Sequence, residues 1–187
     1  MEKITFADVG GLLVETYTKE HVPATAPAIE DYQLYSDKKT RLLLTADEIP
    51  FVFYVPRLHA YGAAKITTEE VKNESPLKRF KEVLALYSLK PSEVCAYLGP
   101  SLTFSHVIVE RPVILDLIAR GYRAATKRTD GIDFFDVRMM LVVMLRKLGL
   151  DFKNIYLDGH DTFECDSLLY SALRGDNKKN PTVISVH

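Results

Sequence analysis

The chain of 187 residues has no tryptophan, only two cysteines and no excess of charge of either sign. Its 24 basic and 25 acidic residues nearly cancel, which predicts neither nucleic acid as a partner nor an acidic tail. Cys95 and Cys165 are too few for the disulfide framework of a secreted protein. Every apolar run is far shorter than the roughly 18 residues of a membrane span. Since no signal peptide follows Met1 either, we expect a cytoplasmic protein.

Several motifs that carry chemistry are also missing. The sequence has no GxGxxG motif and no Walker A motif, so neither standard cradle for nucleotide phosphates is expected. It has no GxSxG nucleophile elbow. Its five histidines form no HxH, HExxH or HxxxH group, and neither cysteine has a Cys or His neighbour at ligand spacing. Local motifs therefore identify no metal or nucleotide site.

What the sequence does contain is typical of a globular domain, at 47% hydrophobic and 26% charged residues. Apolar runs predict strands at residues 3–18 (two strands around Gly10-Gly11), 40–49, 50–56, 60–65, 92–100, 154–159 and 182–186. Apolar residues at helical spacing predict helices at residues 74–91 and 109–126, and a third within residues 132–150 whose apolar face starts at Val137. Residues 165–176 fit either a helix or an extended piece bounded by turns.

The order of these elements predicts the fold class. Strands gather early, and helices alternate with strands later, which favours an α/β (α+β) fold in which helices cover a mixed sheet. We expect one such domain over residues 1–187. Ser75 is the expected N-cap of the first helix, with Pro76 in its first turn, and Gly149 is the expected end of the last helix.

Four stretches in order are similar to the motifs of one protein family. They are TADEIPFVFYVPRLHAYGAAKITTEE, GPSLTFSHVIV, FFDVRMMLVVMLRKLGLDFKNI and DTFECDSLLYSALRGDNKKNPTVISV. Together they resemble the YfiH or laccase-domain family, whose members carry TADCxPVLLxDP and GAxHAGWRG in the first stretch. The resemblance runs over roughly residues 40–186, and the chain looks shortened at its N-terminus relative to full-length members.

The resemblance implies a fold and a set of activities. The family has a single α/β sandwich-like domain, a fold shared with the deamidase domains of certain bacterial toxins. Its members were once described as multicopper polyphenol oxidases and are now associated with purine nucleoside phosphorylase and adenosine deaminase activity. A nucleoside or another small molecule is therefore the ligand that the resemblance implies.

The family's active site resembles a His/Cys/His constellation that can hold zinc or copper, and this chain departs from it. Glu48 stands at the cysteine of TADC, and Lys65 stands at the histidine of HAGW. Tyr17 aligns with the first histidine, with His21 as the alternative. A lysine ammonium cannot bind a metal, so the resemblance combined with these substitutions predicts no metal and no cofactor. Glu48 and Lys65 are expected to form an ion pair in the place of the metal.

A second group of family positions lies near the C-terminus. Asp161 stands at a family cysteine, and Leu173 replaces the first arginine of SYRRD, whereas Ser171 and Arg174 are retained. By resemblance, Ser171, Arg174 and Asp161 are candidate substrate-binding residues.

Three functions follow from this comparison. The first is a relative that has lost the metal and the phosphorylase-type activity and now acts in binding or as a structural protein. The second is an enzyme without metal, in which Glu48 is the general base, Lys65 an electrostatic anchor and Tyr17 a hydrogen-bond donor. The third is a displaced metal site that uses His21 or His59. An unrelated α/β domain with accidental similarity is the remaining alternative.

Overall fold

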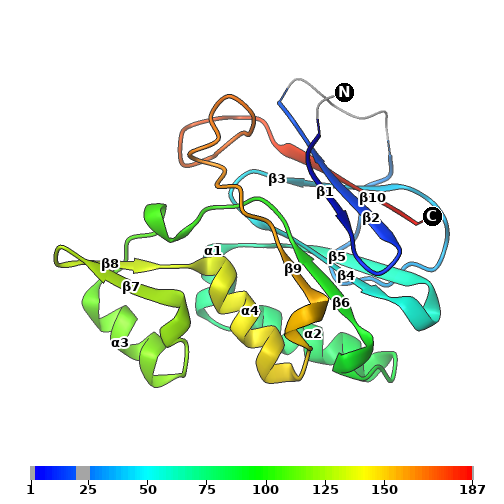
Figure 1. The fold of residues 1–187 in the computed structure, drawn as a ribbon, viewed down its shortest axis with the longest axis horizontal. Coiled ribbons are helices and arrows are strands. Elements are labelled where there is room, and N and C mark those ends of the chain that lie inside the picture. The colour runs from blue at the N-terminus through cyan, green and yellow to red at the C-terminus, as the bar shows by residue number, and fades with distance from the viewer. Residues whose placement is uncertain (1–2, 20–25, 187) are drawn as a thin grey trace.

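The computed structural model describes residues 3–19 and 26–186, and in it two four-stranded β-sheets lie face to face (Figure 1). The strands of the first sheet are β1 (Lys3–Asp8), β2 (Leu12–Tyr17), β3 (Arg41–Thr45) and β10 (Asn180–Val186). Their order is β1-β2-β10-β3, and all neighbours are antiparallel. The last strand of the chain therefore lies between two early ones.

The second sheet has the order β5-β4-β6-β9. Its strands are β4 (Ile49–Val55), β5 (Ala60–Ile66), β6 (Cys95–Leu98) and β9 (Ile155–Leu157). β4 is antiparallel to both of its neighbours, β5 and β6, whereas β9 runs parallel to β6. This sheet is therefore mixed, as the fold class predicted from the sequence requires.

The two faces of the second sheet pack against different layers. Val52 and Tyr54 of β4 lie in a buried cluster with apolar residues of the first sheet, such as Leu12. Phe51 and Phe53 alternate with them and lie in the larger cluster on the other face. Because both of its faces are covered, all seven residues of β4 are buried. The predicted α/β class is confirmed, with the helices on one face of this sheet.

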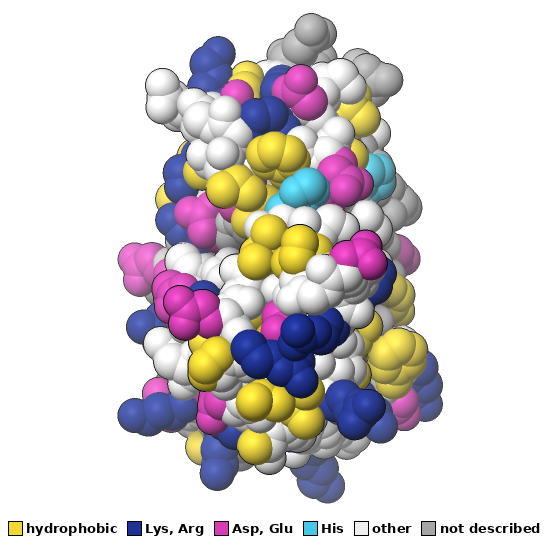
Figure 2. All heavy atoms as spheres, turned by 90° about the vertical axis from the view of Figure 1, so that its left-hand side faces the viewer, with side chains coloured by type: hydrophobic (Ala, Val, Ile, Leu, Met, Phe, Trp, Pro, Cys, Tyr) yellow, Lys and Arg dark blue, Asp and Glu magenta, His cyan; other side chains and the backbone are white. Residues whose placement is uncertain are grey.

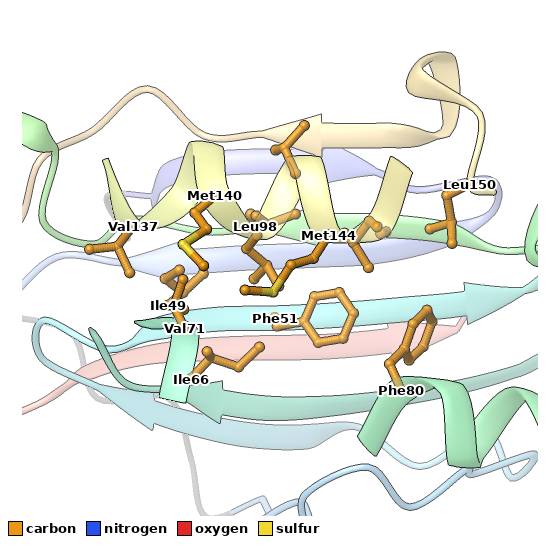
Figure 3. Packing of buried hydrophobic residues seen from close by; sticks show 14 of the residues in the cluster. Ile49, Phe51, Ile66, Val71, Phe80, Leu98, Val137, Met140, Met144 and Leu150 are labelled. Atoms are coloured by element: carbon orange, nitrogen blue, oxygen red, sulfur yellow. The ribbon is translucent and has the colours of Figure 1, made fainter. Parts of the chain in front are cut away.

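The helices of the described residues are α1 (Thr68–Lys72), α2 (Ser75–Leu86), α3 (Arg111–Ala119) and α4 (Val137–Leu148). Figure 3 shows Met140 and Met144 of α4 above Phe51 of the second sheet. The ring of Phe80 of α2 meets Phe51 edge-on, with centroids 5.4 Å apart. Among the residues that the structure describes, every helix is too short or too polar to cross a membrane.

Short 3-10 turns lie between these elements: η1 (Pro56–Leu58), η2 (Pro91–Glu93), η3 (Phe104–His106), η4 (Arg123–Ala125) and η5 (Phe152–Asn154). Residues 165–176 form turns, so the helical alternative for this stretch is wrong. Ser75 is the first residue of α2 and not its N-cap, which is Glu74 in the left-handed conformation at φ 62°. Gly149 ends α4 at φ 101°, as predicted.

The last helix begins at Val137, the first of its predicted apolar positions, but the hairpin before it was not predicted. Residues 132–135 form the strand β8 (Ile132–Phe135), which pairs with β7 (Thr126–Thr129) in a hairpin beside α3. The side chain of Asp136 accepts a hydrogen bond of 2.9 Å from the backbone N–H of Met139. This N-cap begins α4 at Val137, because it supplies an acceptor for an N–H group that the helix itself leaves unpaired.

Candidate functional site

Glu48 lies in the bend between β3 and β4, and both oxygens of its carboxylate have partners. Oε2 accepts a hydrogen bond of 2.7 Å from the backbone N–H of Ala46. Oε1 lies 3.1 Å from Nζ of Lys179, the residue just before β10. Burial acts to raise the pKa of Glu48, but the backbone hydrogen bonds and the Lys179 ammonium outweigh it and hold that pKa below its usual value. Glu48 is therefore an ion-paired carboxylate at neutral pH.

The predicted ion pair between Glu48 and Lys65 is wrong. Lys65 is an exposed residue of β5 and lies opposite Pro50 in the strand ladder. Glu48 precedes β4 in a bend, and in the part of the chain that the structure describes its only ion-pair partner is Lys179. The physical reason is the strand order, because β10 runs beside β3 and brings Lys179 to the carboxylate.

Tyr17 is the last residue of β2 and is 6% exposed. Its hydroxyl donates a hydrogen bond of 2.9 Å to Oε2 of Glu15, which also pairs with Lys3 on the neighbouring strand. Burial and the Glu15 carboxylate raise the pKa of Tyr17 to about 12. Within residues 3–19 and 26–186, no hydrogen bond or ion pair joins Tyr17 to Glu48 or to Lys65.

The alternative histidines do not complete a site at Glu48. His21 lies outside the described residues. His59 follows η1 at the far end of β4, and seven strand residues at about 3.3 Å each place it roughly 20 Å from Glu48. It lines a separate cavity of about 280 Å³ with Asp37 and Lys38. Glu48 and His59 therefore cannot share one metal ion.

Asp161 holds a loop together through its carboxylate. Oδ2 accepts the backbone N–H of Thr103 at 2.7 Å, and Oδ1 accepts those of Phe163 and Glu164 at 2.8 and 3.1 Å. Burial alone would raise the pKa of Asp161, but these hydrogen bonds outweigh it and lower that pKa. With 4% exposure, Asp161 presents little of its surface to a ligand.

His106 of η3 lies beside this loop, and no sequence motif pointed to it. Its Nε2 atom is 3.2 Å from Oε1 of Glu164 and 3.9 Å from Oδ1 of Asp161. The His106 ring also packs on Phe163, with centroids 4.5 Å apart. One ligand atom from each of His106, Asp161 and Glu164 lies within 4.8 Å of the other two.

Arg174 and Ser171 lie inside the turn-rich loop of residues 165–176. The guanidinium of Arg174 donates to the backbone carbonyls of Thr162, Phe163 and Leu169 at 3.0, 2.6 and 2.5 Å. Asp176 accepts both from Arg174 at 2.6 Å and from the backbone N–H of Ser171 at 2.9 Å. With these hydrogen bonds, Arg174 stabilises the conformation of its own loop. A substrate-binding role for Ser171, Arg174 and Asp161 stays a prediction.

A small cavity of about 230 Å³ opens beside Glu48. Thr67 and Thr68 at the start of α1, together with Asp47 and Ala172, form the rest of its lining. Asp47 accepts the hydroxyl of Thr162 and the backbone N–H of Leu173, each at 2.7 Å. The carboxylate of Asp47 thus ties the bend to the C-terminal loop. Asp47 could have been noticed in the sequence, because it stands in the TAD motif directly before Glu48.

Comparison with known proteins identifies the family of this chain. The model of the family described as multi-copper polyphenol oxidoreductase laccase matches residues 28–185. The chain belongs to this family. The resemblance to laccase-domain proteins inferred from the four sequence stretches is therefore confirmed. No curated protein matches the chain significantly.

Solved structures share the fold of this laccase-domain chain. A hypothetical protein YfiH of Bacillus licheniformis and YlmD of Geobacillus stearothermophilus each align with a TM-score of 0.71 at 17% identity, over 82% of this chain and 60% of theirs. Protein NMB0706 of Neisseria meningitidis aligns with a TM-score of 0.67 at 19% identity, over 82% of this chain and 63% of its own. The chain thus spans less than two thirds of these structures, and identities this low show the fold alone.

The metal that the family resemblance implies does not fit the residues at these positions. A catalytic zinc or copper site needs about three N, S or O donors. Glu48 offers a carboxylate, but the Lys179 ammonium lies 3.1 Å from it and occupies the side where a cation would bind. At the other two family positions, Lys65 has an exposed ammonium group, which cannot bind a metal, and the hydroxyl of Tyr17 is directed to Glu15. Glu48, Lys65 and Tyr17 therefore do not supply the three donors of a catalytic metal site.

The ion pair can be measured by a double-mutant cycle. Glu48→Ala and Lys179→Ala are expected to show a coupling of about 0.5 to 1 kcal/mol in urea unfolding, because Lys179 is 46% exposed and the pair is partly screened. A cycle of Glu48→Ala with Lys65→Ala is the control and should show additive effects. Coupling to Lys65 without coupling to Lys179 would contradict the geometry.

Proposed function

We propose that this laccase-domain chain has lost the metal-dependent chemistry that the resemblance implies at Glu48 and Lys65, and that it acts as a binding protein for a small polar ligand. The observation that carries this proposal is the 3.1 Å ion pair between Glu48 and Lys179. The Lys179 ammonium beside the Glu48 carboxylate repels a divalent cation by Coulomb interaction. Binding a metal would require Lys179 to leave its carboxylate and lose the pairing.

The cavity beside Glu48 supports a small ligand. Its volume of about 230 Å³ is below the ~300 Å³ at which pockets for drug-sized molecules begin. Its lining combines two carboxylates, Asp47 and Glu48, with Thr68, whose hydroxyl group can donate and accept hydrogen bonds. The hydroxyl of Thr67 is used by Glu70 in the N-terminal cap of α1. A compact molecule with hydroxyl or amino groups, or the ribose end of a nucleoside, matches this chemistry.

Two measurements test the proposal. Purified protein is expected to hold substoichiometric zinc and copper by plasma mass spectrometry, and to leave inosine and adenosine unchanged in the presence of phosphate. Stoichiometric metal that is lost in Glu48→Ala would overturn the proposal. Metal-free phosphorolysis that is lost in Glu48→Ala would overturn it in favour of an enzyme that uses Glu48, Lys65 and Tyr17.

One observation favours a second candidate function, a metal site displaced to His106, Asp161 and Glu164. Tetrahedral zinc ligands lie about 3.3 Å from one another, and the distances of 3.2 and 3.9 Å from His106 Nε2 approach this value. Zinc that is lost in His106→Ala but retained in His160→Ala would place it there. His160 is a matched control, since it pairs with Asp158 at 2.9 Å but belongs to no three-donor group among the described residues.

A further inference from the structure

A second concave site lies on a different part of the molecule, between α3 and the β7–β8 hairpin. It is a cavity of about 380 Å³. Its basic lining residues are Arg111, Arg123, Lys127 and Arg128. The lower half of the face drawn in Figure 2, on the side where β7, β8 and α3 lie in Figure 1, carries a group of adjoining Lys and Arg side chains. The cavity shares no lining residue with the one beside Glu48.

A buried carboxylate holds two of these arginines in place. Asp133 of β8 is 5% exposed, and its Oδ1 accepts a hydrogen bond of 3.0 Å from Arg111. Its Oδ2 accepts one of 3.2 Å from Arg128, the cross-strand neighbour of Asp133 on β7. Each guanidinium has five N–H donors and uses only part of this set on Asp133. The arrangement therefore fixes both arginines while leaving donors for a ligand.

The other two cations have no acidic partner among the described residues. Arg123 and Lys127 form no ion pair there, and the Lys127 ammonium lies over the ring of Phe104 at 4.6 Å from its centroid. The lining has three arginines, with Lys127 at the side shared with the neighbouring cavity of Phe104, against the single carboxylate of Asp133, so the concave site carries an excess positive charge. Low-dielectric walls around such a charge strengthen its attraction for an anion.

We propose that this cavity binds a small phosphorylated ligand. Arginine forks match the geometry of phosphate oxygens, and two or more negative charges on the ligand would balance the excess charge. Ile114 and Ile118 of α3 also line the cavity and provide an apolar surface for the rest of the ligand. A long nucleic acid fits less well, because the basic group is confined to one cavity on a chain whose net charge is −1.

The probe for the test is inorganic pyrophosphate, titrated calorimetrically at low ionic strength into the full chain. We expect saturable binding, weakened about tenfold or more in the Arg123→Gln/Lys127→Gln double variant, because two charge-assisted contacts are lost. These two positions are chosen since their replacement breaks no ion pair with Asp133. Circular dichroism of the double variant verifies that the fold is intact.

The control is Lys81→Gln, an exposed position on α2 outside the cavity, which should leave pyrophosphate binding unchanged. Absence of saturable binding to the wild-type chain would overturn the proposal. So would equal binding by the double variant and the wild type. A single-stranded RNA oligomer that binds more tightly than pyrophosphate and is weakened by the same double variant would overturn the small-ligand assignment in favour of a nucleic-acid surface.

Discussion

Replacing Asp161 by alanine is expected to lower the free energy of unfolding by about 3 to 5 kcal/mol. The carboxylate accepts hydrogen bonds from the backbone N–H groups of Thr103, Phe163 and Glu164, and the residue is 4% exposed. Alanine would leave these donors unpaired where little water reaches them. An unsatisfied buried donor destabilises the fold by more than the net free energy that its hydrogen bond contributed. Urea unfolding followed by circular dichroism measures the loss.

A graded series tests which oxygen matters. In Asp161→Asn the amide oxygen can keep the two bonds of Oδ1 to Phe163 and Glu164, whereas the amide NH₂ group faces the N–H of Thr103. We therefore expect an intermediate loss of about 1 to 2 kcal/mol. Glu164→Gln is the control with an exposed side chain, and it should change stability by less than ~0.5 kcal/mol. Equal effects of all three substitutions would contradict the role given to Asp161.

The effect of Asp161 has a defined pH dependence. Because hydrogen bonds lower its pKa in the folded state below the ordinary value of 3.8, its carboxylate stabilises the fold fully at pH values well above 3.8. The contribution is lost as the pH falls below 3.8 and through the lower folded-state pKa, where the carboxylate takes up a proton. The stability difference between wild type and Asp161→Asn should therefore shrink in acid. A difference that grows there would show that another group dominates.

Local sequence signals predicted most elements because each depends on nearby residues. The glycines between β1 and β2 and the apolar spacing of α4 are examples of such signals. The prediction missed the hairpin before Asp136, because residues 132–135 were not recognised as a strand. The Asp130-Gly131 turn was the overlooked hairpin signal, since both residues adopt positive φ, at 51° and 82°.

Long-range partners could not be predicted in the same way. The family motif placed Glu48 at a former ligand position, but its partner Lys179 lies 131 residues further along the chain. The two meet only because β10 lies between β2 and β3, an order that no local pattern specifies. The same reason applies to His106 and Glu164, which are 58 residues apart and come together through two loops. A sequence motif therefore predicts which residue stands at a site position, but it does not predict which distant residues contact it.

Arg174→Lys is expected to lower the free energy of unfolding by about 2 to 4 kcal/mol, nearly as much as Arg174→Ala. The two terminal nitrogens of Arg174 reach the backbone carbonyls of Thr162, Phe163 and Leu169 and the carboxylate of Asp176 at distances of 2.5 to 3.0 Å. A lysine has three donors on one atom and cannot reach all four acceptors, so it leaves carbonyls unpaired beside a side chain that is only 18% exposed.

The matched control is Arg57→Lys, the same substitution at a surface pair in which Arg57 is 55% exposed and lies 3.1 Å from Glu93. Its effect should stay below ~0.5 kcal/mol, because an ammonium can replace one exposed contact. Arg174→Lys can also separate a structural role from a ligand-binding one. If the variant unfolds like wild type but binds a nucleoside more weakly, Arg174 contacts that ligand and does not mainly hold its loop together. A large stability loss with the cavity of Arg123 and Lys127 still binding pyrophosphate is the result that the geometry predicts.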